Sequence, residues 1–97
     1  IKVSSDNTGE HVWQLPLWDE YCDQVKSNVA DVKNLGSPGQ AGTIAGAAFL
    51  KAFVGKDIPW AHFDVAGTSY HVENRSYIQK NSASGQVIRL VLDLLGA

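Results

Sequence analysis

The segment "PWAHFDVAGTSYH", residues 59–71, holds two histidines and an aspartate within an otherwise apolar run. If the segment is a β-strand, His62 and Asp64 lie on the same face, and His71 follows beyond the end of the strand. Imidazole and carboxylate groups bind zinc, so these three side chains are candidates for a metal site. No second ligand motif lies nearby in the sequence. We therefore favour the alternative that His62 and Asp64 bond to backbone or loop groups at the edge of a core.

Two further features carry weaker signs of chemistry. Cys22 would act as a nucleophile only beside a histidine base, and it falls on an apolar helical face, which favours a buried structural thiol. The loop "GSPGQAG", residues 36–42, places glycines before a helix, as phosphate-binding loops do. It lacks the lysine-serine ending of a P-loop and the spacing of a dinucleotide-binding loop. Neither feature predicts a complete active site.

Alternating apolar and polar residues predict three short strands, and residues that repeat at helical spacing predict helices between and after them. The strands are predicted at residues 11–17, 28–34 and 60–67, and the helices at residues 17–27, 43–54 and 85–95. Ser84 precedes the last helix and is its expected N-cap. Gly46 lies inside the second helix, where glycine costs up to about 1 kcal/mol relative to alanine. We therefore expect another backbone to pack closely against Gly46.

This order of elements predicts an α/β fold in which short strands alternate with helices. Three strands make a narrow sheet, and a parallel sheet requires cover on both faces. The chain is therefore expected to form the C-terminal edge of a larger mixed sheet with flanking helices. A segment taken from such a sheet would expose an unpaired strand edge and an apolar face, so we expect it to self-associate or to depend on the missing part.

Composition excludes several classes of protein. With 97 residues, 44% of them apolar and 19% charged, the chain has the composition of one folded domain or less. A net charge of -2 and dispersed lysines give no indication of nucleic-acid binding. No apolar run approaches the roughly 20 residues that span a bilayer. The single cysteine fits a reducing, cytoplasmic setting, and the absence of methionine leads us to expect a fragment or processed piece of a longer protein.

Four blocks of sequence carry a resemblance to a known family: "VWQLPLWDEY", "SNVADVKNLG", "AGTIAGAAFLKAFV" and "PWAHFDVAGT". Their order and spacing resemble the C-terminal part of the catalytic domain of the cytosolic leucine aminopeptidases, a family of two-metal, hexameric enzymes. The resemblance covers residues 8–69 and extends to the last helix, "SGQVIRLVLDLL". It implies that residues 1–97 are the C-terminal part of such a catalytic domain.

The resemblance also implies chemistry that this chain does not complete by itself. In the family, two divalent ions, zinc or manganese, activate a water that attacks the amide next to a free N-terminal amine. The family's metal ligands and catalytic arginine lie in blocks upstream of the matching part, and neither block occurs here. The resemblance therefore implies no catalytic residue and no metal ligand in this chain, His62 and Asp64 included. It implies a parent enzyme that is a cytoplasmic homohexamer and acts on peptides with free N-termini, with no membrane or nucleic-acid partner indicated.

What the resemblance assigns to this chain is the wall of the substrate pocket. Leu35 matches a position that lines the pocket for the residue after the scissile bond, and Gly42 matches its neighbour. Ala66 matches the floor of the pocket that accepts the N-terminal side chain, and Ser69 matches a nearby wall position. The alternative is that Leu35, Gly42 and Ala66 are merely packing residues.

Two positions depart from the family pattern. A bulkier or different residue often stands where Ser69 is, and the second glycine of a common Thr-Gly-x-Gly-Val-Arg pattern is replaced by Val87 in "SGQVIR". One alternative reading of the whole chain is a non-catalytic structural or scaffold relative of the family. Another is an unrelated small α/β binding module.

Overall fold

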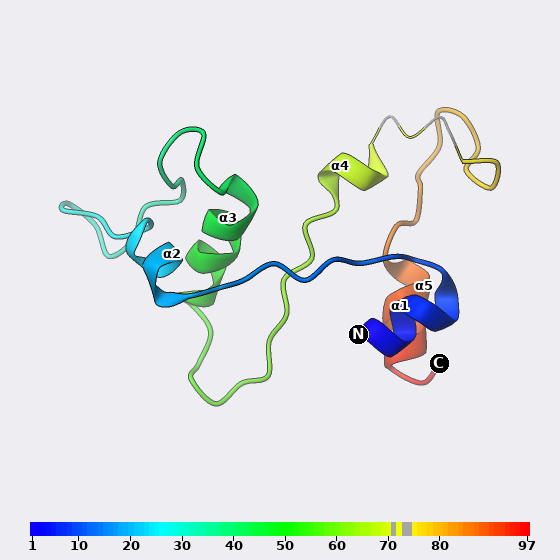
Figure 1. The fold of residues 1–97 in the computed structure, drawn as a ribbon, viewed down its shortest axis with the longest axis horizontal. Coiled ribbons are helices and arrows are strands. Elements are labelled where there is room, and N and C mark those ends of the chain that lie inside the picture. The colour runs from blue at the N-terminus through cyan, green and yellow to red at the C-terminus, as the bar shows by residue number, and fades with distance from the viewer. Residues whose placement is uncertain (71, 73–74) are drawn as a thin grey trace. The chain divides into compact units, whose positions relative to one another are not determined.

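The computed structural model describes residues 1–70, 72 and 75–97. These residues form five helices, α1 (Lys2–Thr8), α2 (Asp19–Asp23), α3 (Gly42–Lys51), α4 (Ala66–Ser69) and α5 (Ile88–Leu94), joined by turns and irregular chain (Figure 1). They divide into two compact units, residues 1–13 with 64–97 and residues 14–63. Within that described part, no helix has the length and apolarity needed to cross a membrane.

The first unit is built on the contact between α1 and α5 (Figure 1). Leu90 of α5 is fully buried, and Ser4 and Ser5 of α1 are buried as well. α1 ends at Gly9, whose φ of 70° lies in the left-handed region that glycine adopts without strain. The hydrophobic pattern does not predict α1, because its mostly polar residues carry no apolar stripe of helical period.

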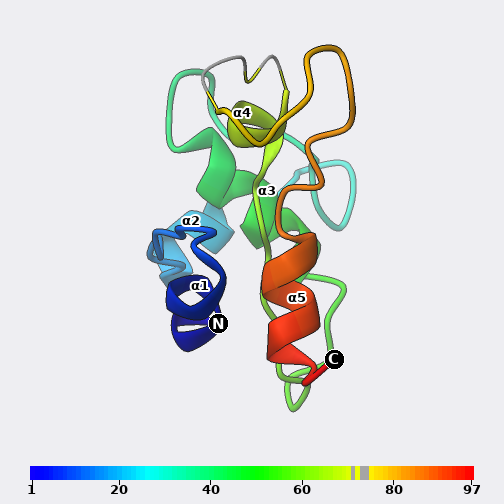
Figure 2. The same ribbon diagram turned by 90° about the vertical axis from the view of Figure 1, so that its right-hand side faces the viewer.

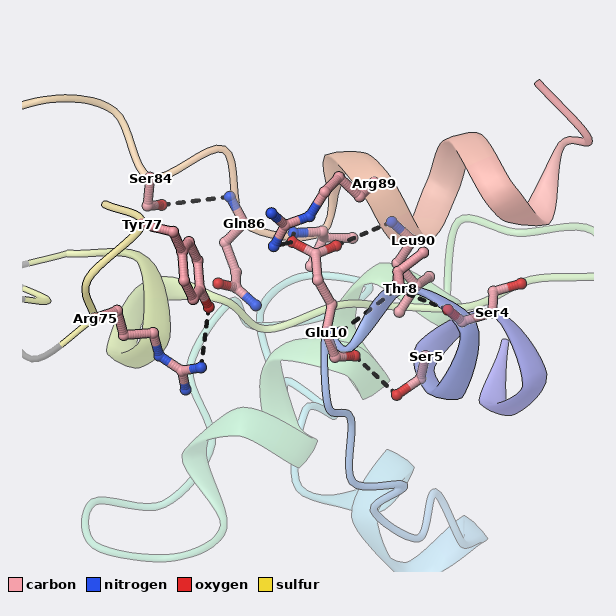
Figure 3. Close-up of polar contacts among 11 residues, drawn as sticks. Ser4, Ser5, Thr8, Glu10, Arg75, Tyr77, Ser84, Gln86, Arg89 and Leu90 are labelled. Carbon is pink, nitrogen blue, oxygen red and sulfur yellow. Dashed lines mark hydrogen bonds and ion pairs between the residues drawn. The ribbon is translucent and has the colours of Figure 1, made fainter. Parts of the chain in front are cut away.

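A buried carboxylate closes the N-terminus of α5. The first backbone N–H groups of a helix lack partners inside the helix. Glu10, which is only 4% exposed, accepts hydrogen bonds from the backbone N–H of Leu90 at 2.9 Å and of Val87 at 3.1 Å. Its carboxylate also accepts one from Arg89 Nη2 at 3.3 Å (Figure 3). A carboxylate at this end of a helix is stabilised both by the hydrogen bonds and by the helix dipole.

The polar residues of α1 hold Glu10 in place. Ser5 Oγ donates a hydrogen bond to the Glu10 carbonyl oxygen at 2.8 Å. Thr8 Oγ1 accepts one from the Glu10 backbone N–H at 3.4 Å and donates another to the Ser4 carbonyl oxygen at 2.7 Å (Figure 3). The buried serines of α1 therefore fix the backbone that carries the capping carboxylate.

The prediction that Ser84 is the N-cap of the last helix is wrong. Val87 occupies the N-cap position, and Ser84 Oγ instead accepts a hydrogen bond from the Gln86 backbone N–H at 3.4 Å. Val87 has a φ of 73°, a conformation in which a β-branched residue is strained. The local sequence does not reveal the true cap, because Glu10 lies 77 residues away from Val87 along the chain.

The second unit is built on the contact between α2 and α3. Its buried residues are Val25, Ala45 and Ala48. The prediction of a helix near residues 43–54 is confirmed by α3, and that of a helix at residues 17–27 is confirmed only over the five residues of α2. Beyond α2 the chain turns back, and Lys33 donates a backbone hydrogen bond to Val25 at 2.8 Å.

The predicted α/β fold with short strands alternating with helices is wrong for the described residues, which contain no strand and no sheet. Residues 28–34 contribute only to the isolated antiparallel bridge between Lys26 and Val32, and part of the third predicted strand forms α4. A strand is stable only when a neighbour pairs with its backbone N–H and C=O groups. Residues 11–17 and 60–67 are each divided between the two units, so neither unit contains two complete strands that could pair.

The close backbone contact expected at Gly46 is found at a different glycine. A Cβ built on Gly46 would meet nothing within 4 Å, so this position of α3 faces open space. A Cβ built on Gly36, in the loop before α3, would lie 2.8 Å from Cβ of Ala45. The small residues of α3 therefore allow the preceding loop of the same unit to approach the helix.

Candidate substrate-pocket residues

Two of the predicted pocket residues lie in the loop that leads into α3, within the second unit. Leu35 is 74% exposed, although it is a large apolar residue. Gly42, the first residue of α3, is exposed, and a Cβ built on it would meet nothing within 4 Å. Between them the chain makes a turn in which the Gln40 N–H donates to the Ser37 carbonyl oxygen at 3.2 Å. The loop therefore leaves open space around both positions.

Gly36 anchors this loop between the two helices of the unit. The Cβ that a larger residue would carry lies 2.8 Å from Ala45 Cβ on α3 and 3.1 Å from Gln24 Oε1 at the C-cap of α2. Separations below 3.0 Å are essentially never seen for real Cβ atoms, so only glycine fits here without a shift. Gln24 Oε1 is itself buried and has no hydrogen-bond partner in the described part of the chain.

The other two predicted pocket residues lie on α4, within the first unit. Figure 2 shows α4 as a short helix with irregular chain on either side. Ala66 is its first residue and Ser69 its last, so the two lie three apart, on the same face of one helical turn. Ala66 is exposed and Ser69 is half-buried. The turn is held by the backbone hydrogen bond from Tyr70 N–H to the Ala66 carbonyl oxygen at 3.2 Å.

Two open hollows in the second unit are lined by residues other than the predicted pocket residues. One, of about 520 Å³, is lined by the C-terminal end of α3 together with residues such as Ile58 and Trp60. The other, of about 410 Å³, lies between residues 30–34 and the side chains of Phe49 and Phe53. Neither hollow is lined by Leu35 or Gly42.

The candidate metal ligands do not form a metal site in the described residues. His62 is half-buried and its ring stacks on that of Trp60, with centroids 6.2 Å apart and planes at 21°. Asp64 is exposed, and His71 lies outside the described residues. Among residues 1–70, 72 and 75–97, no three histidine, cysteine or acidic side chains come together in a way that could hold a metal ion.

Cys22 and the ion pair between Lys26 and Asp23 are two further groups of the second unit that could take part in chemistry. Cys22, predicted to be buried, is half-buried on α2. A hydrogen bond from Lys26 Nζ to the Asp23 carboxylate at 2.6 Å, together with the charge of that carboxylate, raises the pKa of Lys26 from its ordinary value of 10.5. Both side chains of this pair are largely exposed, so the pair contributes little to stability.

Sequence reasoning missed the residues that fix the loop and the capping carboxylate. Gly36 stands in a glycine-proline loop, where a glycine ordinarily signals a turn and gives no sign of a helix packed against it. Gln24 and Ala45 carry no local signal of this contact either. Neither arrangement is a local pattern, because Glu10 lies 77–80 residues from the groups that it caps and Gly36 packs against two separate helices.

The chain matches a known family over nearly its whole length. The description of that family is "Cytosol aminopeptidase family, catalytic domain", and the match covers residues 1–92. A probable cytosol aminopeptidase of Geobacter sp. (strain M21) is 50% identical over 95 residues, which is 98% of this chain and 19% of the relative. Those of Geobacter sulfurreducens and Chlorobium luteolum are 48% identical over 97 residues and 46% identical over 95 residues.

These relatives are named as peptidases, and the matched residues include the four blocks on which the sequence resemblance is based. The chain belongs to the cytosol aminopeptidase family, which confirms that resemblance. It spans about a fifth of the length of the relatives, since it covers 19% of the first two and 18% of the third.

Proposed function

We propose that residues 1–97 are the C-terminal part of the catalytic domain of a leucyl-type metallo-aminopeptidase. The whole protein removes N-terminal residues, leucine among them, from peptides with a free amine. The observation that carries this proposal is the match to the catalytic domain of the cytosol aminopeptidase family over residues 1–92. Identities of 46–50% to three probable cytosol aminopeptidases support it.

In this proposal the segment contributes pocket wall and packing. Leu35 and Gly42 border the pocket for the second residue of the peptide, and Ala66 and Ser69 border the pocket for the first. The exposure of Leu35 and the open space at Gly42 leave room for a substrate side chain beside them. Apolar pockets of this kind discriminate by about 1–3 kcal/mol for each methylene that fits or fails to fit.

We assign the two divalent ions, zinc or manganese, to polypeptide outside this segment. The described residues contain no three ligand side chains that come together. In this proposal the partners of the segment are the rest of the parent chain and the peptide substrate, and the whole enzyme is a cytoplasmic homohexamer.

The proposal is tested by aminopeptidase assays on the full-length protein that carries this segment. We expect hydrolysis of leucyl peptides with a free amine and none of the same peptides after N-acetylation. Replacing Ala66 with leucine should lower kcat/KM for N-terminal leucine about tenfold or more relative to N-terminal alanine, because the larger side chain fills the pocket floor.

The matched control is Ala52→Leu, which makes the same substitution at an exposed position outside the proposed pocket. It should leave the preference for N-terminal leucine over alanine unchanged. A full-length protein that is folded and metal-loaded but hydrolyses no peptide would overturn the proposal and favour a non-catalytic relative of the family.

A further inference from the structure

The backbone of Gly36 packs closely against α3 at the buried Ala45. Carbon atoms in contact are ordinarily about 3.5–4.0 Å apart. The position of a Cβ on residue 36 is only 2.8 Å from Ala45 Cβ, so the methyl group and the loop backbone are already packed without a gap. Ala45 is 2% exposed, and its N–H donates to the Ala41 carbonyl oxygen at 2.9 Å in the first turn of α3. The loop at Gly36 therefore packs against a buried alanine of the first turn of α3.

The same Cβ position of residue 36 also lies close to α2. Gln24, the C-cap residue of α2, places its buried Oε1 3.1 Å from the same Cβ position. The backbone of Gln24 is held by the hydrogen bond from its N–H to the Tyr21 carbonyl oxygen at 3.2 Å. Residue 36 is half-buried and lies close to both α2 and α3, while its neighbours Leu35 and Ser37 are exposed.

We infer that Gly36 is a positioning residue that fixes the backbone carrying Leu35 and thereby sets the preference of the enzyme for the second residue of the peptide. This inference rests on the proposed function, in which Leu35 borders that pocket. Leu35 is 74% exposed and has little packing of its own, so its location follows from the backbone of the residue next to it. The close packing of Gly36 against Ala45 and Gln24 holds this backbone in place.

The expected consequence of Gly36→Ala is a displacement of the loop by about 1 Å, the difference between the present 2.8 Å and an ordinary carbon contact. A displacement of this size in a substrate-binding wall can cost up to about a hundredfold in rate. We expect kcat/KM for Leu-Leu to fall about tenfold relative to Leu-Gly, because only the leucine at the second position uses the wall. The preference for the first residue, measured as Leu-Leu against Ala-Leu, should not change.

Two further variants separate positioning from a general loss of structure. Gly46→Ala makes the same chemical change in the same unit at a position with nothing within 4 Å, and it should leave both preferences unchanged. The double variant Gly36→Ala with Ala45→Gly removes the opposing methyl group, so it should recover most of the second-residue preference. Ala45→Gly alone keeps the wild-type loop but loosens the contact, and it should weaken that preference about twofold to threefold.

The experiment measures kcat and KM of the full-length protein and these variants on Leu-Leu, Leu-Gly and Ala-Leu, with thermal unfolding of each. A selective loss at the second residue in Gly36→Ala, restored by Ala45→Gly, supports the inference. Equal losses on all three peptides, or an unchanged second-residue preference in an active Gly36→Ala enzyme, overturn it. If Gly36→Ala does not fold, the same selectivity ratios in Ala45→Gly decide the question. A wild-type protein that hydrolyses none of the peptides overturns the proposed function, and the inference falls with it.

Discussion

The two units of this chain hold their short helices together by different physical means. In the first unit, a buried carboxylate from one end of the chain caps a helix near the other end, and polar residues of α1 support it. In the second unit, small apolar residues of α3 let a loop and α2 approach closely. The first arrangement is sensitive to the loss of a charge or a hydrogen bond, and the second is sensitive to added volume.

The largest effect should come from removing the capping carboxylate. Glu10→Ala leaves the buried backbone N–H of Leu90 and the half-buried backbone N–H of Val87 without their acceptor, which should cost the first unit about 3 kcal/mol. Hydrogen exchange should show it as a large loss of protection at the Leu90 amide.

The control for this prediction is Glu20→Ala, which removes an exposed acidic residue from α2 of the other unit. It should leave the Leu90 amide as protected as in the wild type. Equal protection of Leu90 in Glu10→Ala and in the wild type would show that the carboxylate does not hold α5.

A smaller effect, of opposite sign, is expected from Val87→Gly. Val87 has a φ of 73°, where a β-branched residue is strained and glycine is not. The substitution should stabilise the first unit by about 1 kcal/mol, observed as a higher urea midpoint with an unchanged slope. A lower midpoint would mean that packing of the half-buried valine side chain outweighs the strain.

The smallest effect concerns the exposed ion pair of the second unit. Because the pKa of Lys26 is raised in the folded chain by its hydrogen bond to Asp23, the contribution of the pair is fully present below pH 10.5. It is lost as the pH rises through the raised pKa. An NMR titration of Lys26 should therefore give a pKa above 10.5 that returns toward the ordinary value in Asp23→Asn. A titration unaffected by Asp23→Asn would contradict the assignment.

The sequence predicts the parts of this fold that depend on local pattern. The apolar and small residues of α3 repeat at helical spacing, and the family blocks lie in one order, so that helix and the family are both found correctly. The strands are predicted wrongly because alternation alone does not supply a neighbour, and here two of the three runs are divided between the units.

The rest of the fold depends on contacts between separate elements of the chain. Ser84 is of a residue type favoured at an N-cap, yet Glu10 takes that role from the other end of the chain. Gly46, where we expected a close backbone contact, faces open space, whereas Gly36 makes a close contact. Both glycines belong to the same region of small residues, so the sequence alone does not distinguish them. Leu35, Gly42, Ala66 and Ser69 remain predictions as pocket residues, because only a substrate-dependent measurement tests them.

The central proposal is that catalysis needs polypeptide outside this segment. The most direct test compares the isolated 97-residue chain with the full-length protein on leucine p-nitroanilide in the presence of manganese. We expect turnover by the full-length protein and none by the isolated chain. Clear metal-dependent turnover by the isolated chain would contradict the claim.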